Sequence, residues 1–146
     1  MIFEYSINQS NLFQVKSHLD QCSELFVPTL SSYVDIYSYS EKLIQKATRI
    51  EAFDEIKLIG LIAVYINEDE NLCFVSNVSV IPGFSGKGIA TTLFYRTQNL
   101  IKNLRVDTMI LHVDKNNYPA INFYEKLGFQ HDLIFDNKIK MILYLK

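Results

Sequence analysis

The chain has few of the residues that mark special structural classes. It contains no tryptophan and only two cysteines among 146 residues. Cys22 and Cys73 form no C-x-x-C pair, which excludes a disulfide framework and gives no metal-ligand spacing. The three histidines are isolated from one another, so we expect no metal site. Cys73 alternates with apolar residues in a strand pattern, and we interpret it as a buried thiol rather than a nucleophile.

Charge of one sign and long apolar runs are also scarce. The formal net charge is −2, which argues against a polybasic surface for nucleic acid or an anionic membrane. The longest apolar stretch, residues 56–66, is interrupted by Lys57 and Gly60 and is far shorter than the roughly 20 residues of a membrane-spanning helix. No basic region or cleavage site follows Met1. We therefore expect a cytoplasmic protein with no nucleic-acid or membrane partner.

Apolar periodicity predicts the element order β-α-α-β-β-β-α-β-α-β-β. This order predicts an α/β (α+β) fold with a mixed, mostly antiparallel sheet of about seven strands and helices on both faces. The length fits a single domain spanning residues 1–146. The expected helices cover 12–22, a second segment from about Ser40, 89–104 and the segment after Asn117; the expected strands cover 1–7, 48–53, 56–66, 72–80, 108–113, 129–135 and 138–145.

The most informative segment is a glycine-rich loop between an apolar strand and an amphipathic helix. Glycine adopts positive φ without steric cost, so Gly86 and Gly88 let several amides turn inward at the positive end of the helix dipole. Such a loop predicts a bound pyrophosphate. A dinucleotide site would need a small residue at Thr91, and a P-loop would need Ser or Thr after Gly-Lys. The spacing excludes both alternatives.

A second segment carries a pattern of five spaced residues: Asn117, Ala120, Tyr124, Gly128 and Phe129. Together, the two segments resemble the GNAT superfamily of acyl-CoA-dependent N-acetyltransferases. In the first segment, Gly88 and Ala90 match the last two defined positions of the family's pyrophosphate loop, and Ser85 stands where Gln or Arg is usual. The resemblance is sharpest over residues 71–135.

The resemblance implies an enzyme with acetyl-CoA as cosubstrate. It would transfer the acetyl group to the primary amine of a small molecule, by direct attack in a ternary complex. A peptide amino terminus is an alternative acceptor, and a non-catalytic acyl-CoA-binding module is an alternative of another class. Dimers are common in the family, so a homodimer stays open.

The resemblance also implies which residues contact the cofactor. Backbone groups of Val78 and Val80 would face the pantetheine arm and the thioester carbonyl. Asn117 and Ala120 would lie beside the same arm, although helix capping alone would equally explain Asn117. Amides of the loop would bind the diphosphate: Ser85, Gly86, Lys87, Gly88, Ile89 and Ala90. A solvated side chain would explain Lys87 as well.

Catalysis needs a proton donor for the departing thiolate and a base for the amine. Tyr124 is the predicted general acid, because a phenol with a pKa near 10 is protonated at neutral pH. The alternative is that Tyr124 is a core aromatic. No carboxylate occupies the strand position where many family members carry a base. Ser76 stands there and would hold a water that accepts the proton.

Other residues are open candidates for the acceptor side. His112 could border the site, with a structural histidine as the alternative. Three tyrosines cluster just before the second expected helix, in the segment that usually lines the acceptor pocket in the family: Tyr33, Tyr37 and Tyr39. Three acidic residues of the first half are further candidates for the base: Glu24, Glu51 and Asp54.

Overall fold

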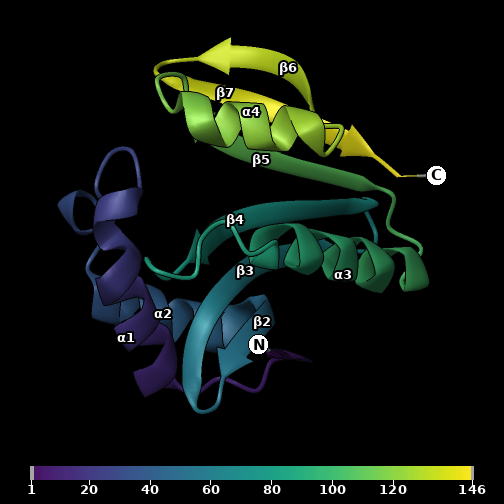
Figure 1. Ribbon diagram of the computed structural model, residues 1–146. Coiled ribbons are helices and arrows are strands. Elements are labelled where there is room, and N and C mark those ends of the chain that lie inside the picture. Colours follow the sequence, from purple (N-terminus) through teal and green to yellow (C-terminus); the bar gives the residue numbers. More distant parts are fainter. Residues whose placement is uncertain (1, 146) are drawn as a thin grey trace.

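A computed structural model describes residues 2–145 as a seven-stranded sheet with helices on both faces (Figure 1). The strand order in the sheet is β1-β2-β3-β4-β5-β7-β6, and all neighbours are antiparallel except β4 and β5. The predicted fold class is confirmed. The strands are β1 Glu4–Ile7, β2 Thr48–Asp54, β3 Lys57–Asn67, β4 Leu72–Val80, β5 Thr108–Asp114, β6 Gln130–Phe135 and β7 Lys138–Tyr144; the helices are α1 Leu12–Cys22, α2 Ile36–Lys46, α3 Ile89–Asn103 and α4 Tyr118–Lys126.

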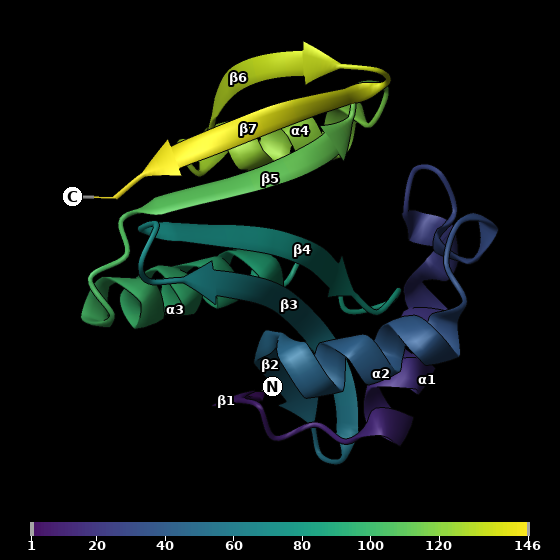
Figure 2. The same cartoon turned by 180° about the vertical axis from the view of Figure 1, so that it is seen from behind.

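The helices divide into two layers. Figure 2 shows α2 in front of β2 and β3, with α3 and α4 behind the sheet. Apolar residues of α1 and α2, among them Leu19 and Leu43, pack with β2 and β3 in one cluster. Residues of α3 and α4 pack in a second, larger cluster on the opposite face, where Phe94 is fully buried. Burial of these two apolar faces is the main stabilising term of the fold.

Helix α2 begins earlier than the sequence predicts. We expected it from about Ser40, but it starts at Ile36 because Asp35 caps it and accepts a hydrogen bond from the Ser38 amide at 3.0 Å. Tyr37 and Tyr39 therefore lie inside the helix. Its first turns are rich in serine and tyrosine, which weakens the apolar periodicity on which the prediction rested.

Strand β4 contains a β-bulge that the sequence does not reveal. Val75 lies opposite Val64 and Asn77 lies opposite Ala63, so Ser76 is the extra residue. Beyond the bulge, each side chain therefore points to the opposite face of the sheet from the one that strict alternation would give it. Val78 packs against the cluster beneath α3 and α4, whereas Asn77 is buried on the side of α1.

Strands β4 and β5 pair over only three residues each. The parallel register runs from Cys73 opposite Met109 to Val75 opposite Leu111, and then stops. Beyond that point the two strands diverge, which both views show (Figures 1 and 2). The divergence leaves backbone groups of both strands unpaired, and it opens the middle of the sheet.

Candidate active site

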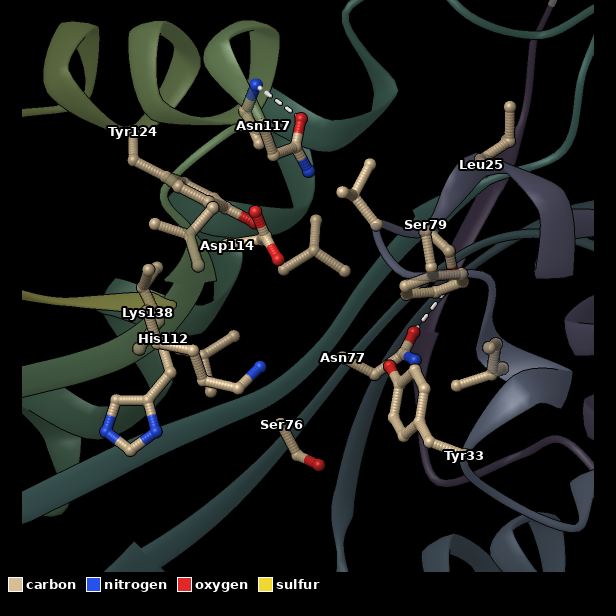
Figure 3. A pocket seen from close by; sticks show the side chains of 18 of the residues that line it. Leu25, Tyr33, Ser76, Asn77, Ser79, His112, Asp114, Asn117, Tyr124 and Lys138 are labelled. Atoms are coloured by element: carbon tan, nitrogen blue, oxygen red, sulfur yellow. Dashed lines mark hydrogen bonds between the residues drawn. The ribbon is translucent and has the colours of Figure 1, made fainter. Parts of the chain in front are cut away.

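A cavity of about 540 Å³ lies where β4 and β5 diverge (Figure 3). We call it the cleft. Its walls come from residues 74–80 of β4, 111–114 of β5, helix α4, Lys138 of β7, Tyr39 of α2 and the segment between α1 and α2. It therefore brings together Tyr124, Ser76, Val78, Val80, Asn117 and Ala120 of the predicted site.

The glycine-rich loop forms a second cavity, of about 300 Å³, beside the first turn of α3. Gly86 and Gly88 have φ of +76° and +77°, and a Cβ added at either would meet no atom within 4 Å. Gly88 is the N-cap of α3, so the amides of the first helical turn have no partner within the helix. Val80 lines both cavities. A phosphate group fits such a start of a helix, with an extended arm leading into the cleft.

The residues predicted to hold the diphosphate do not all face this second cavity. It is lined by Ser85, Gly86, Gly88, Ile89 and Ala90, while the lining does not include Lys87. Lys87 lies exposed on the loop. Its alternative interpretation, a solvated lysine, agrees with this placement.

Substitution of Gly86 tests the loop. We expect Gly86→Ala to weaken coenzyme A binding about tenfold, because the methyl group would enter the space where we predict the phosphate and because it disfavours positive φ. Gly83→Ala is the matched control, since Gly83 has φ of +96°, equally open surroundings and no place in the cavity lining. Isothermal titration calorimetry gives both affinities. Equal losses in the two variants would show that backbone strain, not phosphate contact, is responsible.

Tyr124 joins the core and the cleft. Its ring packs edge-on against Phe94 and Phe129, with centroids 5.9 Å and 5.8 Å away. Figure 3 shows its hydroxyl end directed into the cleft. Burial raises the pKa of Tyr124 to about 12, so the phenol is protonated throughout the neutral range. The ring is thus a core aromatic and the hydroxyl lies at the cleft, while the role of Tyr124 as general acid stays a prediction.

Ser76 lies on the bulge, half-buried, and its hydroxyl is 3.1 Å from the hydroxyl of Tyr39. Tyr39 and Tyr33 line the cleft, whereas Tyr37 is not among the lining residues. The hydrogen bond connects α2 to the bulged strand. It holds the Ser76 hydroxyl at the cleft wall, where the hydroxyl is able to hydrogen-bond a water molecule in the cleft.

His112 also lines the cleft, from β5. Its ring packs edge-on between Phe74 and Phe135, with centroids 5.2 Å and 5.0 Å away. Burial lowers the pKa of His112, and the positive charges of Lys138 and Lys140 lower it further. The imidazole is therefore neutral at physiological pH, and a neutral imidazole is able to accept a proton.

Sequence reasoning missed two charged residues of the cleft, Asp114 and Lys138. They are cross-strand neighbours at the end of β5 and the start of β7. Asp114 also accepts a hydrogen bond from the Asn116 amide at 2.8 Å, which shapes the turn before α4. The sequence feature that could have identified Asp114 is its position at the end of a strand, three residues before the predicted cap at Asn117.

Asn117 caps α4 as predicted. Its side-chain oxygen accepts a hydrogen bond from the Ala120 amide at 3.3 Å, the dashed line at the top of Figure 3. Gly128 ends the helical segment with φ of +105°, also as predicted. The cap fixes the start of α4 at the cleft and thereby the place from which Tyr124 extends.

The structure removes Glu51 from the candidate bases. Glu51 is fully buried, and its carboxylate accepts hydrogen bonds from Ser10, the Gln9 amide and Ser6 and pairs with the Arg49 guanidinium at 3.3 Å. This cluster lies between β1, β2 and α2, and Glu51 does not line the cleft. Glu24 and Asp54 do not line it either. Glu51 was misjudged because its partners are about forty positions away in the chain.

Among residues 2–145, no group of three His, Cys, Asp or Glu side chains is arranged to hold a metal ion. Both cysteines are buried and free, which confirms the interpretation of Cys73. No helix in the described part of the chain is long and apolar enough to cross a membrane.

Comparison with known proteins agrees with this geometry. Residues 15–129 match the profile of the acetyltransferase (GNAT) family. The chain is 39% identical over 59 residues to GCN5-related N-acetyltransferase 4, chloroplastic, of Arabidopsis thaliana, covering 40% of this chain and 20% of that protein. It is 40% identical over 57 residues to an N-alpha-acetyltransferase of Saccharolobus solfataricus, covering 38% and 34% of the two chains. The match thus spans well under two thirds of these relatives.

Solved structures show the same fold over nearly the whole length. Ard1 from Thermoplasma volcanium superposes with a TM-score of 0.80 at 16% identity, covering 97% of this chain and 98% of that one. PaiA N-acetyltransferase from Thermoplasma acidophilum, solved in complex with coenzyme A, gives 0.79 at 20% identity and 99% coverage of both. The fold is thus one found in N-acetyltransferases. With the profile match, the chain belongs to the GNAT acetyltransferase family.

Proposed function

We propose that this protein is an acetyl-CoA-dependent N-acetyltransferase that acetylates the primary amine of a small molecule by direct attack in a ternary complex. The observation that carries the proposal is that the glycine-loop cavity and the cleft adjoin at Val80, which lines both, and that Tyr124 and His112 also line the cleft. Amides of residues 85–90 would hold the diphosphate, and Lys87 would add a positive charge nearby. Asn117 and Ala120 would lie beside the pantetheine arm.

The cosubstrate supplies an activated acetyl thioester. In the transfer, a bond forms between the amine nitrogen and the acetyl carbon, and the bond from that carbon to sulfur breaks. His112 receives the proton that the amine loses, through a water held by the Ser76 hydroxyl, and Tyr124 gives its proton to the departing sulfur. Unpaired backbone groups around Val78 and Val80 would orient the arm and polarise the carbonyl.

The pH profile tests the role of His112. Because its pKa lies below the usual 6.5, the base is neutral above that pH and becomes inactive only when it is protonated in more acidic solution. We expect kcat to rise with pH to a plateau, with a midpoint below about 6.5. His112→Gln is expected to lower kcat about 100-fold and to abolish this limb. His131→Gln is the control, since His131 is exposed beside Glu125.

The walls of the cleft bear on the choice of acceptor. Leu25, Val27 and Tyr33 line it and are exposed, which favours an amine attached to an apolar or aromatic group. Asp114 would attract the ammonium form of that amine. A peptide amino terminus is the second candidate, because relatives of the chain include N-alpha-acetyltransferases.

A panel of four amines decides between these acceptors and the non-catalytic alternative. Spermidine, glucosamine, tyramine and tetraalanine with a free amino terminus are each incubated with acetyl-CoA, and thiol release is followed. We expect turnover to be fastest with tyramine. Fastest turnover with tetraalanine would favour the peptide. Tight coenzyme A binding without turnover of any amine would indicate a binding module.

Three broader expectations from the sequence stay predictions. They are a single domain over residues 1–146, a cytoplasmic location and a homodimer. Limited proteolysis, cell fractionation and light scattering test them in turn. We also propose that the reaction uses no metal, so activity should survive EDTA.

A further inference from the structure

A chain of buried polar groups runs from α1 to the bulged strand β4. His18 is 1% exposed, Ser79 7% and Asn77 3%. The Nδ1 atom of His18 lies 2.9 Å from the Leu58 carbonyl oxygen, and its Nε2 atom lies 2.8 Å from the Ser79 hydroxyl. That hydroxyl lies 2.8 Å from the side-chain amide of Asn77. The chain thus ends at a residue of the cleft wall.

Counting protons along this chain determines how the Asn77 amide is oriented. A carbonyl oxygen only accepts, so Nδ1 of His18 donates to Leu58. Burial lowers the pKa of His18 to about 4, so the ring is neutral and its Nε2 has no proton. The single proton of Ser79 must then go to Nε2. Cys22 does not replace Ser79 as the donor to Nε2, because its sulfur is 3.7 Å from Nε2 and a thiol is a weak donor.

The proton of Ser79 determines which end of the Asn77 side-chain amide faces Ser79. Since the Ser79 proton is used, the Asn77 atom beside Ser79 has to be the donor, the NH₂ group. Nitrogen and oxygen of an amide are assigned from the hydrogen-bond network, and this network places the nitrogen toward Ser79. The other end of the amide is then the oxygen. That end is buried and has no hydrogen-bond partner among residues 2–145.

We infer that Asn77 is a binding residue for the acceptor, whose amine donates an N–H hydrogen bond to this side-chain oxygen. The inference rests on the proposed function. A buried acceptor without a donor is unfavourable in the free protein, and an incoming amine relieves it. An amine donates in both its neutral and its protonated form, and the ammonium form makes a charge-assisted hydrogen bond that a neutral alcohol or thiol does not offer. Asn77 thus favours amines at the cleft.

The place of Asn77 suits this role. It follows the bulged Ser76 directly, so the amine bound by Asn77 lies beside the residue proposed to hold the proton-accepting water. Figure 3 shows the Tyr33 side chain extending toward Asn77. Tyr33 is 57% exposed, and exposed side chains change rotamer within nanoseconds. Because the unpaired end of the Asn77 amide is shielded from solvent, a rotamer change of Tyr33 would be needed to admit the amine.

Two substitutions at one position test the inference. Asn77→Leu keeps the volume and removes the oxygen, so we expect the KM for the amine to rise about tenfold while the Kd for coenzyme A stays within about twofold. Asn77→Asp, protonated in this buried site, presents a donor to Ser79 and an oxygen to the cleft, and should keep the KM within about threefold of wild type. The probe is whichever of the four panel amines turns over fastest.

Cys22→Ala is the control for destabilisation, because it removes a contact to His18 in the same network and leaves Asn77 unchanged. It should lower Tm and leave the KM for the amine unchanged. A measurement on wild-type protein covers the case in which Asn77→Leu fails to fold. The ¹³C resonance of the Asn77 side-chain carbonyl should shift when the probe amine is added to the coenzyme A complex.

The results separate two kinds of failure. If wild-type protein turns over an amine but Asn77→Leu keeps its KM, or Asn77→Asp raises it as much, the inference is wrong and the proposed function stands. An unmoved carbonyl resonance at saturating amine has the same meaning. If wild-type protein turns over none of the four amines, the proposed function itself is contradicted and the inference goes with it.

Discussion

Tyr124→Phe is expected to lower kcat about 100-fold while coenzyme A affinity and Tm stay close to those of the wild type. The substitution removes the only atom of the side chain that the proposed mechanism uses. The ring stays packed against Phe94 and Phe129, and the lost hydroxyl lies at the cleft. Thiol release measured at saturating amine and acetyl-CoA gives kcat, and calorimetry gives the affinity.

The control for Tyr124 is another tyrosine. Tyr144→Phe removes a hydroxyl from an exposed residue of β7 and should leave kcat unchanged. The raised pKa of Tyr124 adds a condition on pH: since the phenol loses its proton only near pH 12, kcat should not decline between pH 7 and about pH 10 on its account. A Tyr124→Phe variant with kcat within threefold of wild type would show that the side chain is only a core aromatic.

Glu51→Gln is expected to destabilise the fold by about 3 kcal/mol, because it leaves the buried Arg49 guanidinium without its counter-charge. Among residues 2–145, the Arg49 guanidinium contacts, in addition to Glu51, only neutral groups: the Ser10 hydroxyl and the carbonyl oxygens of Ser10, Leu43 and Ile44. Urea unfolding monitored by circular dichroism measures the loss. Coenzyme A affinity and kcat at low temperature should be retained, because Glu51 does not line the cleft.

A surface ion pair supplies the comparison. Lys16 and Asp20 are 2.7 Å apart on α1 with exposed side chains, so Asp20→Asn should cost less than about 0.5 kcal/mol. Replacing both buried partners, as in Arg49→Met with Glu51→Leu, should recover most of the stability that Glu51→Gln loses. Unchanged stability in Glu51→Gln together with lost turnover would return Glu51 to the list of catalytic bases.

The parts of the site that the sequence predicted correctly are those built by neighbouring residues. The glycine loop, the cap at Asn117 and the left-handed Gly128 depend on φ preferences and on hydrogen bonds that span a few positions. The limits of β4, Leu72–Val80, followed from alternation within the strand itself. Membership of the family was readable for the same reason, since its two motifs are short patterns.

The contents of the cleft depended on pairing between distant segments. The bulge at Ser76 exists only in the register between β3 and β4, and it reverses the faces that simple alternation predicts for Asn77. The contact between His18 and Ser79 joins residues 61 positions apart. Hydrogen bonds between Ser10 and Glu51 join residues 41 positions apart and turn a candidate base into a structural group.

Short-range patterns thus specified the conformation of the glycine loop and the place of Tyr124 in α4, because backbone conformation and helix periodicity are properties of adjacent residues. Which polar side chains line the cleft was decided when β4 and β5 separated and α1 and α2 packed across one face of the sheet. Burial and partner choice at Asn77, His112 and Asp114 come from those long-range contacts, and no local pattern encodes them.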